Sequence, residues 1–206
     1  NSVSVGEGVF KSTDGGDNWT NVGLKDTEHL AKIVVDPRDG NKVLVCATGH
    51  LWDDNDERGV FKTADGGKTW KKVLAGANGS TGCGMLAMSA QEPNTMFASL
   101  WDFRRQGWTF RSGGPGSGLY KTTDGGKSWH KIGKGLPTFE QDGLGRIGLT
   151  IAASMPSRMF ATIDARRNGG LYRSDDAGEN WHLSTTDDRV VSRASDFAEV
   201  KVDPKN

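Results

Sequence analysis

The chain has 206 residues, which is long enough to bury a sizeable hydrophobic core. Its 26 basic and 26 acidic residues give a formal net charge of zero, so nucleic acid is not an expected partner. No apolar run approaches membrane-spanning length, and the 29 glycines and 7 tryptophans are typical of a turn-rich all-β protein.

Four strand signals follow one another in each of several successive segments. The expected first strands are 33–35, 86–88, 149–151 and 200–202, and the second strands are 43–47, 96–100 and 159–163. The third strands are 8–11, 59–62, 118–121 and 170–173, and each fourth strand begins at a tryptophan nearby. Large apolar residues alternate along the first strands, which indicates that one face is more buried than the other.

A motif, [Ser/Thr]-x-Asp-x-Gly-x-x-Trp, joins the third strand to the fourth. Its aspartates are 51, 59 and 52 residues apart. The four copies are Ser12, Asp14, Gly16, Trp19; Thr63, Asp65, Gly67, Trp70; Thr122, Asp124, Gly126, Trp129; and Ser174, Asp176, Gly178, Trp181. The hydroxyl and carboxylate can bind turn amides, the glycine allows unusual backbone angles, and the tryptophan covers the turn. Metal binding or catalysis is the alternative role, but four copies in one role favour structural hairpins of a stacked repeat.

Four antiparallel strands repeated at this spacing predict an all-β fold, a β-propeller of four-stranded antiparallel blades with hairpins at the motifs. We expect residues 1–29 to end a first blade, and 30–79, 80–140 and 141–190 to form whole blades. Residues 191–206 would supply the first strand of a next blade. Because the pattern starts at a third strand and stops after a first strand, we expect a fragment of a larger propeller, joined to the remaining blades of a parent protein.

The motifs resemble Asp-boxes, the repeats of bacterial neuraminidases. The context Gly118-Leu119-Tyr120-Lys121-Thr122-Thr123-Asp124-Gly125-Gly126-Lys127-Ser128-Trp129 also resembles sortilin-type N-terminal domains and secreted bacterial proteins called glycosyl hydrolases. The resemblance implies a β-propeller in an extracellular or periplasmic location. It leaves activity open, since such propellers include sialidases, xyloglucanases, peptide receptors and assembly factors.

Cys46 and Cys83 are the two cysteines of the chain. Cys46 lies in an expected second strand and Cys83 just before the next first strand. We expect two buried thiols, with a disulfide as the alternative.

Because the strands of a blade are antiparallel, successive connections lie on opposite faces of the disc, and this predicts where a site would lie. The Asp-boxes and the short turns between first and second strands share one face of the disc, and the longer connections share the other. Residues on these longer connections suit sugar stacking and hydrogen bonding, or capture of an acidic peptide. They are Trp52, Asp53, Asp54, Trp101, Asp102, Arg104, Arg105, Trp108, Arg111 and Arg166. The alternative is that the tryptophans only pack the loops together.

Metal and catalytic patterns are sparse. No cofactor is expected, although Asp53, Asn55 and Glu57 alternate oxygen ligands as calcium loops do. A sialidase would need an Arg-Ile-Pro signature and a Tyr-Glu pair. The signature is absent, and both tyrosines fill core positions of third strands.

Asp164 is the candidate catalytic carboxylate. Thr162-Ile163-Asp164 followed by Gly169-Gly170-Leu171-Tyr172-Arg173 resembles the Thr-Asp-x-Gly-Gly-x-Tyr-Arg context of xyloglucanases, but departs from it by an inserted isoleucine and extra residues before the glycines. We therefore expect a recognition scaffold for glycan or peptide. The alternatives are a glycosyl hydrolase module whose carboxylates lie partly outside this chain, and a structural or assembly propeller.

Overall fold

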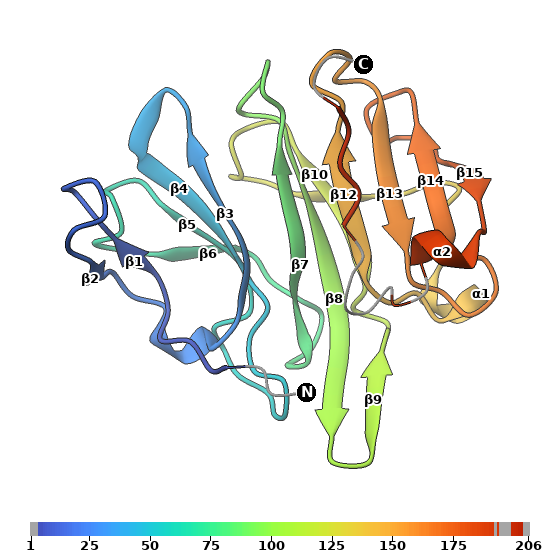
Figure 1. Ribbon diagram of the computed structural model, residues 1–206, viewed down its shortest axis with the longest axis horizontal. Helices are drawn as coiled ribbons and strands as arrows, with labels where there is room; N and C mark the ends of the chain where they lie inside the picture. The colour runs from blue at the N-terminus through green and yellow to red at the C-terminus, as the bar shows by residue number, and fades with distance from the viewer. Residues whose placement is uncertain (1–3, 192, 194–198, 204–206) are drawn as a thin grey trace.

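The computed structural model describes residues 4–191, 193 and 199–203, and Figure 1 shows them as a series of antiparallel sheets. The first sheet pairs β1 (Phe10–Lys11) with β2 (Thr20–Asn21). The second sheet has the order β3 (Leu30–Asp36), β4 (Asp39–Ala47), β5 (Gly59–Thr63), β6 (Lys71–Leu74). The fourth sheet has the order β12 (Ile147–Ile151), β13 (Met159–Ile163), β14 (Gly170–Ser174), β15 (His182–Thr185).

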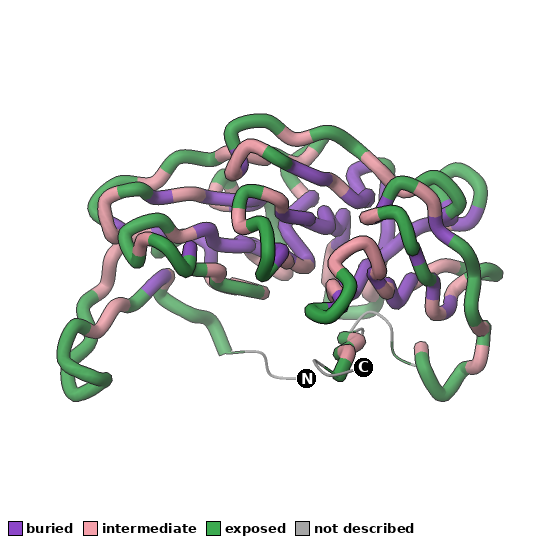
Figure 2. Tube along the Cα trace, turned by 90° about the horizontal axis from the view of Figure 1, so that it is seen from above, coloured by how far each residue is buried: buried purple, intermediate pink, exposed green. Residues whose placement is uncertain are grey.

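The third sheet contains an extra strand. Its main path is β7 (Thr81–Met88), β8 (Met96–Gln106), β10 (Gly118–Thr122) and β11 (His130–Ile132), and β9 (Thr109–Ser112) pairs with the end of β8. Short helical turns complete the chain at η1 (Lys25–Thr27), α1 (Phe139–Asp142) and α2 (Asp188–Val191). Seen from above, the sheets form an arch (Figure 2).

The expected final strand differs from the structure. Val200, Lys201 and Val202 are described, but they belong to no sheet. Residues 192, 194–198 and 204–206 lie outside the described part of the chain. A first strand needs a second strand as its hydrogen-bonding partner, and none of the described strands pairs with residues 200–202.

The hydrophobic core lies between neighbouring sheets, because successive side chains of a strand point to opposite faces. In β4, Val45 and Ala47 pack toward the first sheet, in a cluster with Val9. Leu44 and Cys46 pack the other way, in a cluster with Leu86 and Leu100 of the third sheet. A further cluster joins the third and fourth sheets through Phe97, Leu119, Ile147, Leu149 and Met159. Central strands are therefore buried on both faces.

The first strand β3 is an exception to the predicted burial. Ile33 and Val35, its alternating large residues, are 45% and 51% exposed. Within the described residues the first sheet has two strands, so neither a first nor a second strand stands opposite them there. Instead they line an apolar groove of about 430 Å³ with Phe10, Trp19 and Trp70.

Cys46 and Cys83 form a disulfide, so the expectation of two free thiols was wrong. The bond joins β4 of the second sheet to β7 of the third, and both residues are fully buried. Adjacent blades bring these strands together, although the two cysteines are 37 positions apart in the sequence.

The four Asp-boxes have closely similar internal hydrogen bonds. In the second box, the Thr63 hydroxyl donates to Asp65 over 2.7 Å and accepts from the amide of Gly67 over 3.0 Å. Asp65 also accepts from the amide and the hydroxyl of Thr69. Gly67 has a φ of 95°, a backbone conformation that side chains with a Cβ resist. The same contacts recur around Asp14, Asp124 and Asp176. The box carboxylates are therefore engaged inside their own turns.

Candidate functional site

The longer connections lie at one end of the sheets, the lower edge of Figure 1. We call this surface the long-loop face. It contains the loop 48–58 between β4 and β5, the β8–β9 hairpin with the turn 113–117 that follows it, and the loop 164–169 between β13 and β14. The candidate residues named from the sequence all lie on these segments.

The segment 101–117 is a hairpin rather than an irregular loop. Phe103–Gln106 pairs in register with Thr109–Ser112. The glycines that follow are needed for close packing. A Cβ on Gly114 would lie 2.2 Å from Oδ2 of Asp102, and one on Gly116 would lie 1.9 Å from Oγ1 of Thr81. The turn 113–117 is therefore packed against the strands beneath it, and its glycines do not make it a flexible linker.

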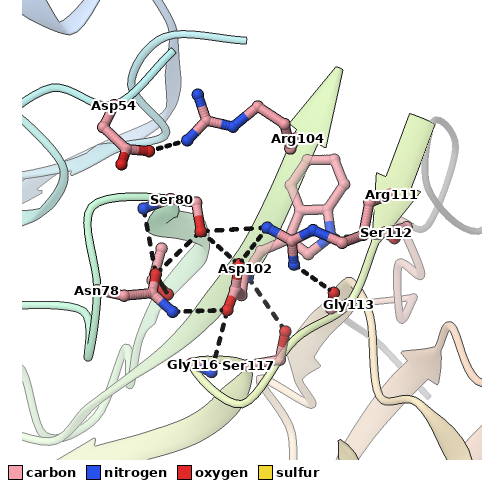
Figure 3. A network of polar contacts seen from close by, with 12 residues as sticks. Asp54, Asn78, Ser80, Asp102, Arg104, Arg111, Ser112, Gly113, Gly116 and Ser117 are labelled. Atoms are coloured by element: carbon pink, nitrogen blue, oxygen red, sulfur yellow. Dashed lines mark hydrogen bonds and ion pairs between the residues drawn. The ribbon is translucent and has the colours of Figure 1, made fainter. Parts of the chain in front are cut away.

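Asp102 is the centre of a buried polar network (Figure 3). Its side chain accepts hydrogen bonds from Asn78 Nδ2 at 2.9 Å and Ser80 Oγ at 2.7 Å, and it forms an ion pair with Arg111 at 2.9 Å. Burial opposes the charged form of this carboxyl, but these three partners outweigh it and lower the pKa of Asp102. The residue is 1% exposed, so the network fastens the hairpin to the loop 78–80 and offers no carboxylate to a ligand.

Loop 48–58 is held against the hairpin by polar contacts. Asp54 forms an ion pair with Arg104, drawn in Figure 3, and the amide of Arg105 donates to the carbonyl of Leu51 over 2.9 Å. Beneath the loop, the buried Arg58 guanidinium donates to the carbonyls of Thr48, His50, Asp53 and Ser80. Loop and hairpin therefore form one connected surface.

The three candidate tryptophans have different environments. Trp101 is 6% exposed, stacks on Phe103 with ring centroids 4.2 Å apart, and donates from Nε1 to Ser112 Oγ over 3.0 Å. It is part of the hairpin's base and has no face open to a ligand. Trp52, on loop 48–58, is 57% exposed, and Trp108, in the hairpin turn, is 84% exposed. These two remain candidates for stacking against a ligand.

Asp164 follows β13 and lies beside the hairpin of the preceding sheet. Its Oδ2 accepts a hydrogen bond from Ser112 Oγ over 2.5 Å, and Ser112 in turn accepts from Trp101. Asp164 is half-buried, whereas Arg166, two residues later, is exposed. Ser112 thus connects the candidate catalytic carboxylate to the hairpin, a link for which the sequence carries no motif.

The three oxygen-bearing residues proposed for calcium have different surroundings. Asp53 contacts His50, the Asn55 amide donates to the Asp26 carbonyl, and one carboxylate oxygen of Glu57 is buried without a hydrogen-bond partner among the described residues. Among residues 4–191, 193 and 199–203, no group of three or more His, Cys, Asp or Glu side chains is arranged to hold a metal ion. Nor does any helix in these ranges have the length and apolar character needed to cross a membrane.

The repeated four-stranded sheets and their Asp-boxes define a β-propeller of the Asp-box class. A family model described as "Sortilin, neurotensin receptor 3" matches residues 7–144, and a BNR/Asp-box repeat model matches residues 172–183. The chain therefore belongs to the Sortilin-Vps10 family.

Individual relatives point to glycosyl-hydrolase-like propellers. A xyloglucanase from Paenibacillus sp. is 28% identical over 134 residues, which is 63% of this chain and 12% of that protein. The crystal structure of a GH74 xyloglucanase from Xanthomonas campestris aligns over 97% of this chain and 31% of that one, with a TM-score of 0.69 and 19% identity. That of an ancestral GH74 enzyme aligns over 89% and 22%, with a TM-score of 0.65 and 19% identity. This chain spans less than a third of each relative, and the two structures establish the shared propeller fold.

Proposed function

We propose that this chain recognises a polysaccharide on its long-loop face, with Trp52 and Trp108 as stacking surfaces. The observation that carries the proposal is the exposure of both rings, 57% and 84%, on two segments that are tied to each other. The amide of Arg105 binds Leu51, next to Trp52, and Arg105 lies three residues before Trp108. Flat aromatic faces beside polar groups suit the apolar faces and hydroxyls of sugar rings.

Two arginines of the face are engaged by carboxylates of the chain itself. Arg104 is paired with Asp54, and Arg111 is paired with Asp102. Capture of an acidic peptide by arginines needs guanidinium groups that are free to bind carboxylates. Arg104 and Arg111 are already paired, and the ligand that we propose is a glycan of the xyloglucan class, suggested by the name of the Paenibacillus relative.

We also propose that the protein acts outside the cytoplasm. The disulfide between Cys46 and Cys83 supports this location, because such bonds persist mainly in oxidising compartments. The polysaccharide that the proposal names is itself extracellular, so the location and the ligand are consistent.

The test is affinity electrophoresis in gels containing xyloglucan. Trp52→Ala and Trp108→Ala should each weaken binding about tenfold or more, since losing a stacking surface costs about 1.5–3 kcal/mol. Trp19→Ala is the matched control, because Trp19 is 61% exposed but belongs to an Asp-box, away from the long-loop face. If xyloglucan slows the migration of the wild type and slows both long-loop variants to the same extent, the proposal is contradicted.

Hydrolysis is the second candidate, and the environment of Asp164 favours it. Unlike Asp102, Asp164 is half-buried, and its side chain accepts a hydrogen bond from Ser112. A half-buried carboxylate oriented by a hydroxyl on the same face is suited to acid or base catalysis of glycoside cleavage. Reducing-end release from a polysaccharide panel including xyloglucan, lost in Asp164→Ala, would support this candidate. Release that the variant retains would assign the chemistry to other carboxylates.

A further inference from the structure

His50 lies between carboxylates of two different segments. Its Nδ1 is 2.7 Å from Oδ1 of Asp53 in the same loop. Its Nε2 is 3.5 Å from Oδ1 of Asp26 and 3.6 Å from Oε1 of Glu28, both on the connection that contains η1. A neutral imidazole has a single N–H, whereas a protonated one has a donor on each side. Only the protonated ring therefore has an N–H toward each segment, together with a positive charge that attracts the carboxylates of both.

Neighbouring residues hold the His50 ring in place. The His50 side chain is 15% exposed, and its carbonyl accepts a hydrogen bond from Arg58. On the other side, Glu28 has a backbone φ of 56°, which residues with a Cβ rarely adopt. That conformation leaves the Glu28 carboxylate 3.6 Å from His50 and 3.8 Å from His29.

We propose that His50 is a positioning residue: its protonated ring fastens loop 48–58, and with it Trp52, to the connection at residues 25–28. Trp52 lies in the four-residue turn that the contact between His50 and Asp53 closes. When the ring loses its proton, its one remaining N–H can serve the 2.7 Å contact with Asp53, and the attraction between Nε2 and the carboxylates of Asp26 and Glu28 is lost. The loop, with Trp52, is then released from the connection at residues 25–28. The ligand part of this inference rests on the function proposed above.

The charges around the ring set the direction of the pH dependence. Burial disfavours the imidazolium, but the hydrogen bond to Asp53 and the charges of Glu28 and Asp53 outweigh it and raise the pKa of His50. The contacts of the protonated His50 ring are therefore fully present below the ordinary pKa of histidine, about 6.5. They are lost as the pH rises through the higher pKa that His50 has in the folded protein. Trp52 should be best ordered in mildly acidic solution.

The first arm of the test follows the indole N–H of Trp52 by NMR between pH 5 and 9, with the signal assigned from Trp52→Phe. In the wild type, this signal should shift with a midpoint above 6.5. It should not shift in His50→Gln, whose side chain does not titrate. His130→Gln is the matched control, because His130 is exposed on β11, and it should behave as the wild type does. An indole signal that is independent of pH, or that still shifts in His50→Gln, would overturn the proposal.

The second arm measures binding of a xyloglucan oligosaccharide by calorimetry over the same pH range. Affinity should fall severalfold with rising pH in the wild type and in His130→Gln, but stay flat in His50→Gln. Affinity that is independent of pH in the wild type would overturn the coupling of His50 to the ligand. If no binding occurs at any pH, the proposed function fails, while the NMR arm still decides whether His50 fastens the loop.

Discussion

Lys62, on the third strand of one blade, donates from Nζ to the carbonyl of Gly125 in the Asp-box of the next blade, 2.6 Å away. The contact is repeated along the arch. Lys11 donates to the carbonyl of Gly66 over 3.3 Å, and Lys121 to that of Ala177 over 3.1 Å. Three of the four boxes, at 63–70, 122–129 and 174–181, therefore join two blades as well as closing their own hairpins.

Removing this inter-blade contact should destabilise the protein. Lys62→Met keeps most of the aliphatic chain but leaves the Gly125 carbonyl without its charged donor, which should cost about 1–2 kcal/mol in unfolding free energy. Lys68→Met is the control, since Lys68 is exposed within a box. Chemical denaturation of the two variants measures the difference, and equal stabilities would show that the contact between blades contributes nothing.

The Asp-boxes should make the fold sensitive to acid. The amide of Asn180, then its side chain and the Ser174 hydroxyl, donate to Asp176 and lower its pKa to about 2, and Asp14 has the same value for equivalent reasons. A depressed pKa contributes stability above the unfolded value near 3.9, and that stability is lost as the pH falls toward about 2. Urea midpoints measured from pH 5 to pH 2 should therefore decline steeply.

Asp176→Asn should lower the urea midpoint at pH 7 and make its decline in acid shallower, because the amide cannot be protonated in this range. Asp17→Asn is the control, since Asp17 accepts no side-chain hydrogen bond among the described residues. An identical acid profile for wild type and Asp176→Asn would refute the assignment of acid sensitivity to the boxes.

The disulfide should stabilise the packing of the second blade on the third. Closing a loop of this length, with a separation of 37 residues, contributes about 3–4 kcal/mol in the chain-entropy model. The unfolding free energy of the double variant Cys46→Ala, Cys83→Ala should be lower by roughly that amount. Reduction should lower the stability of the wild type toward that of the double variant and leave the double variant unchanged. Unchanged thermal unfolding after verified reduction would contradict this expectation.

Arg58 should be needed for the order of the long-loop face. It is 3% exposed and donates to four carbonyls, so Arg58→Met should cost about 2–4 kcal/mol by leaving buried acceptors unpaired. Limited proteolysis should then cut within loop 48–58. The exposed Arg167→Met provides the comparison, and a protease-resistant loop in Arg58→Met would show that other contacts suffice.

Repeat features of the fold could be predicted from the sequence, because each blade repeats the same local chemistry. The Asp-box residues, the strand order within a blade and the face that carries the longer connections all follow from motif spacing and alternation. The exposure of Ile33 and Val35 could not be predicted this way, because it depends on what stands opposite β3 rather than on the pattern of β3 itself.

The site was harder to predict, because its side chains are fixed by contacts between blades. Trp101 belongs to the same predicted set as Trp52 and Trp108, yet β8 continues past Leu100 and buries both Trp101 and Phe103. The apolar positions Phe103 and Phe110 around Gly107-Trp108 are a hairpin signal that could have been found. The pairing of Cys46 with Cys83 and the contact of Ser112 with Asp164 have no counterpart in sequence spacing.

The proposed function requires that polysaccharide binds the long-loop face. Hydrogen–deuterium exchange with and without a saturating xyloglucan oligosaccharide tests it most directly. We predict slower exchange in residues 49–58 and 103–112, with no change in the Asp-box segments 12–19, 63–70, 122–129 and 174–181. Protection confined to the Asp-box segments, or no protection anywhere at saturating oligosaccharide, would contradict the account.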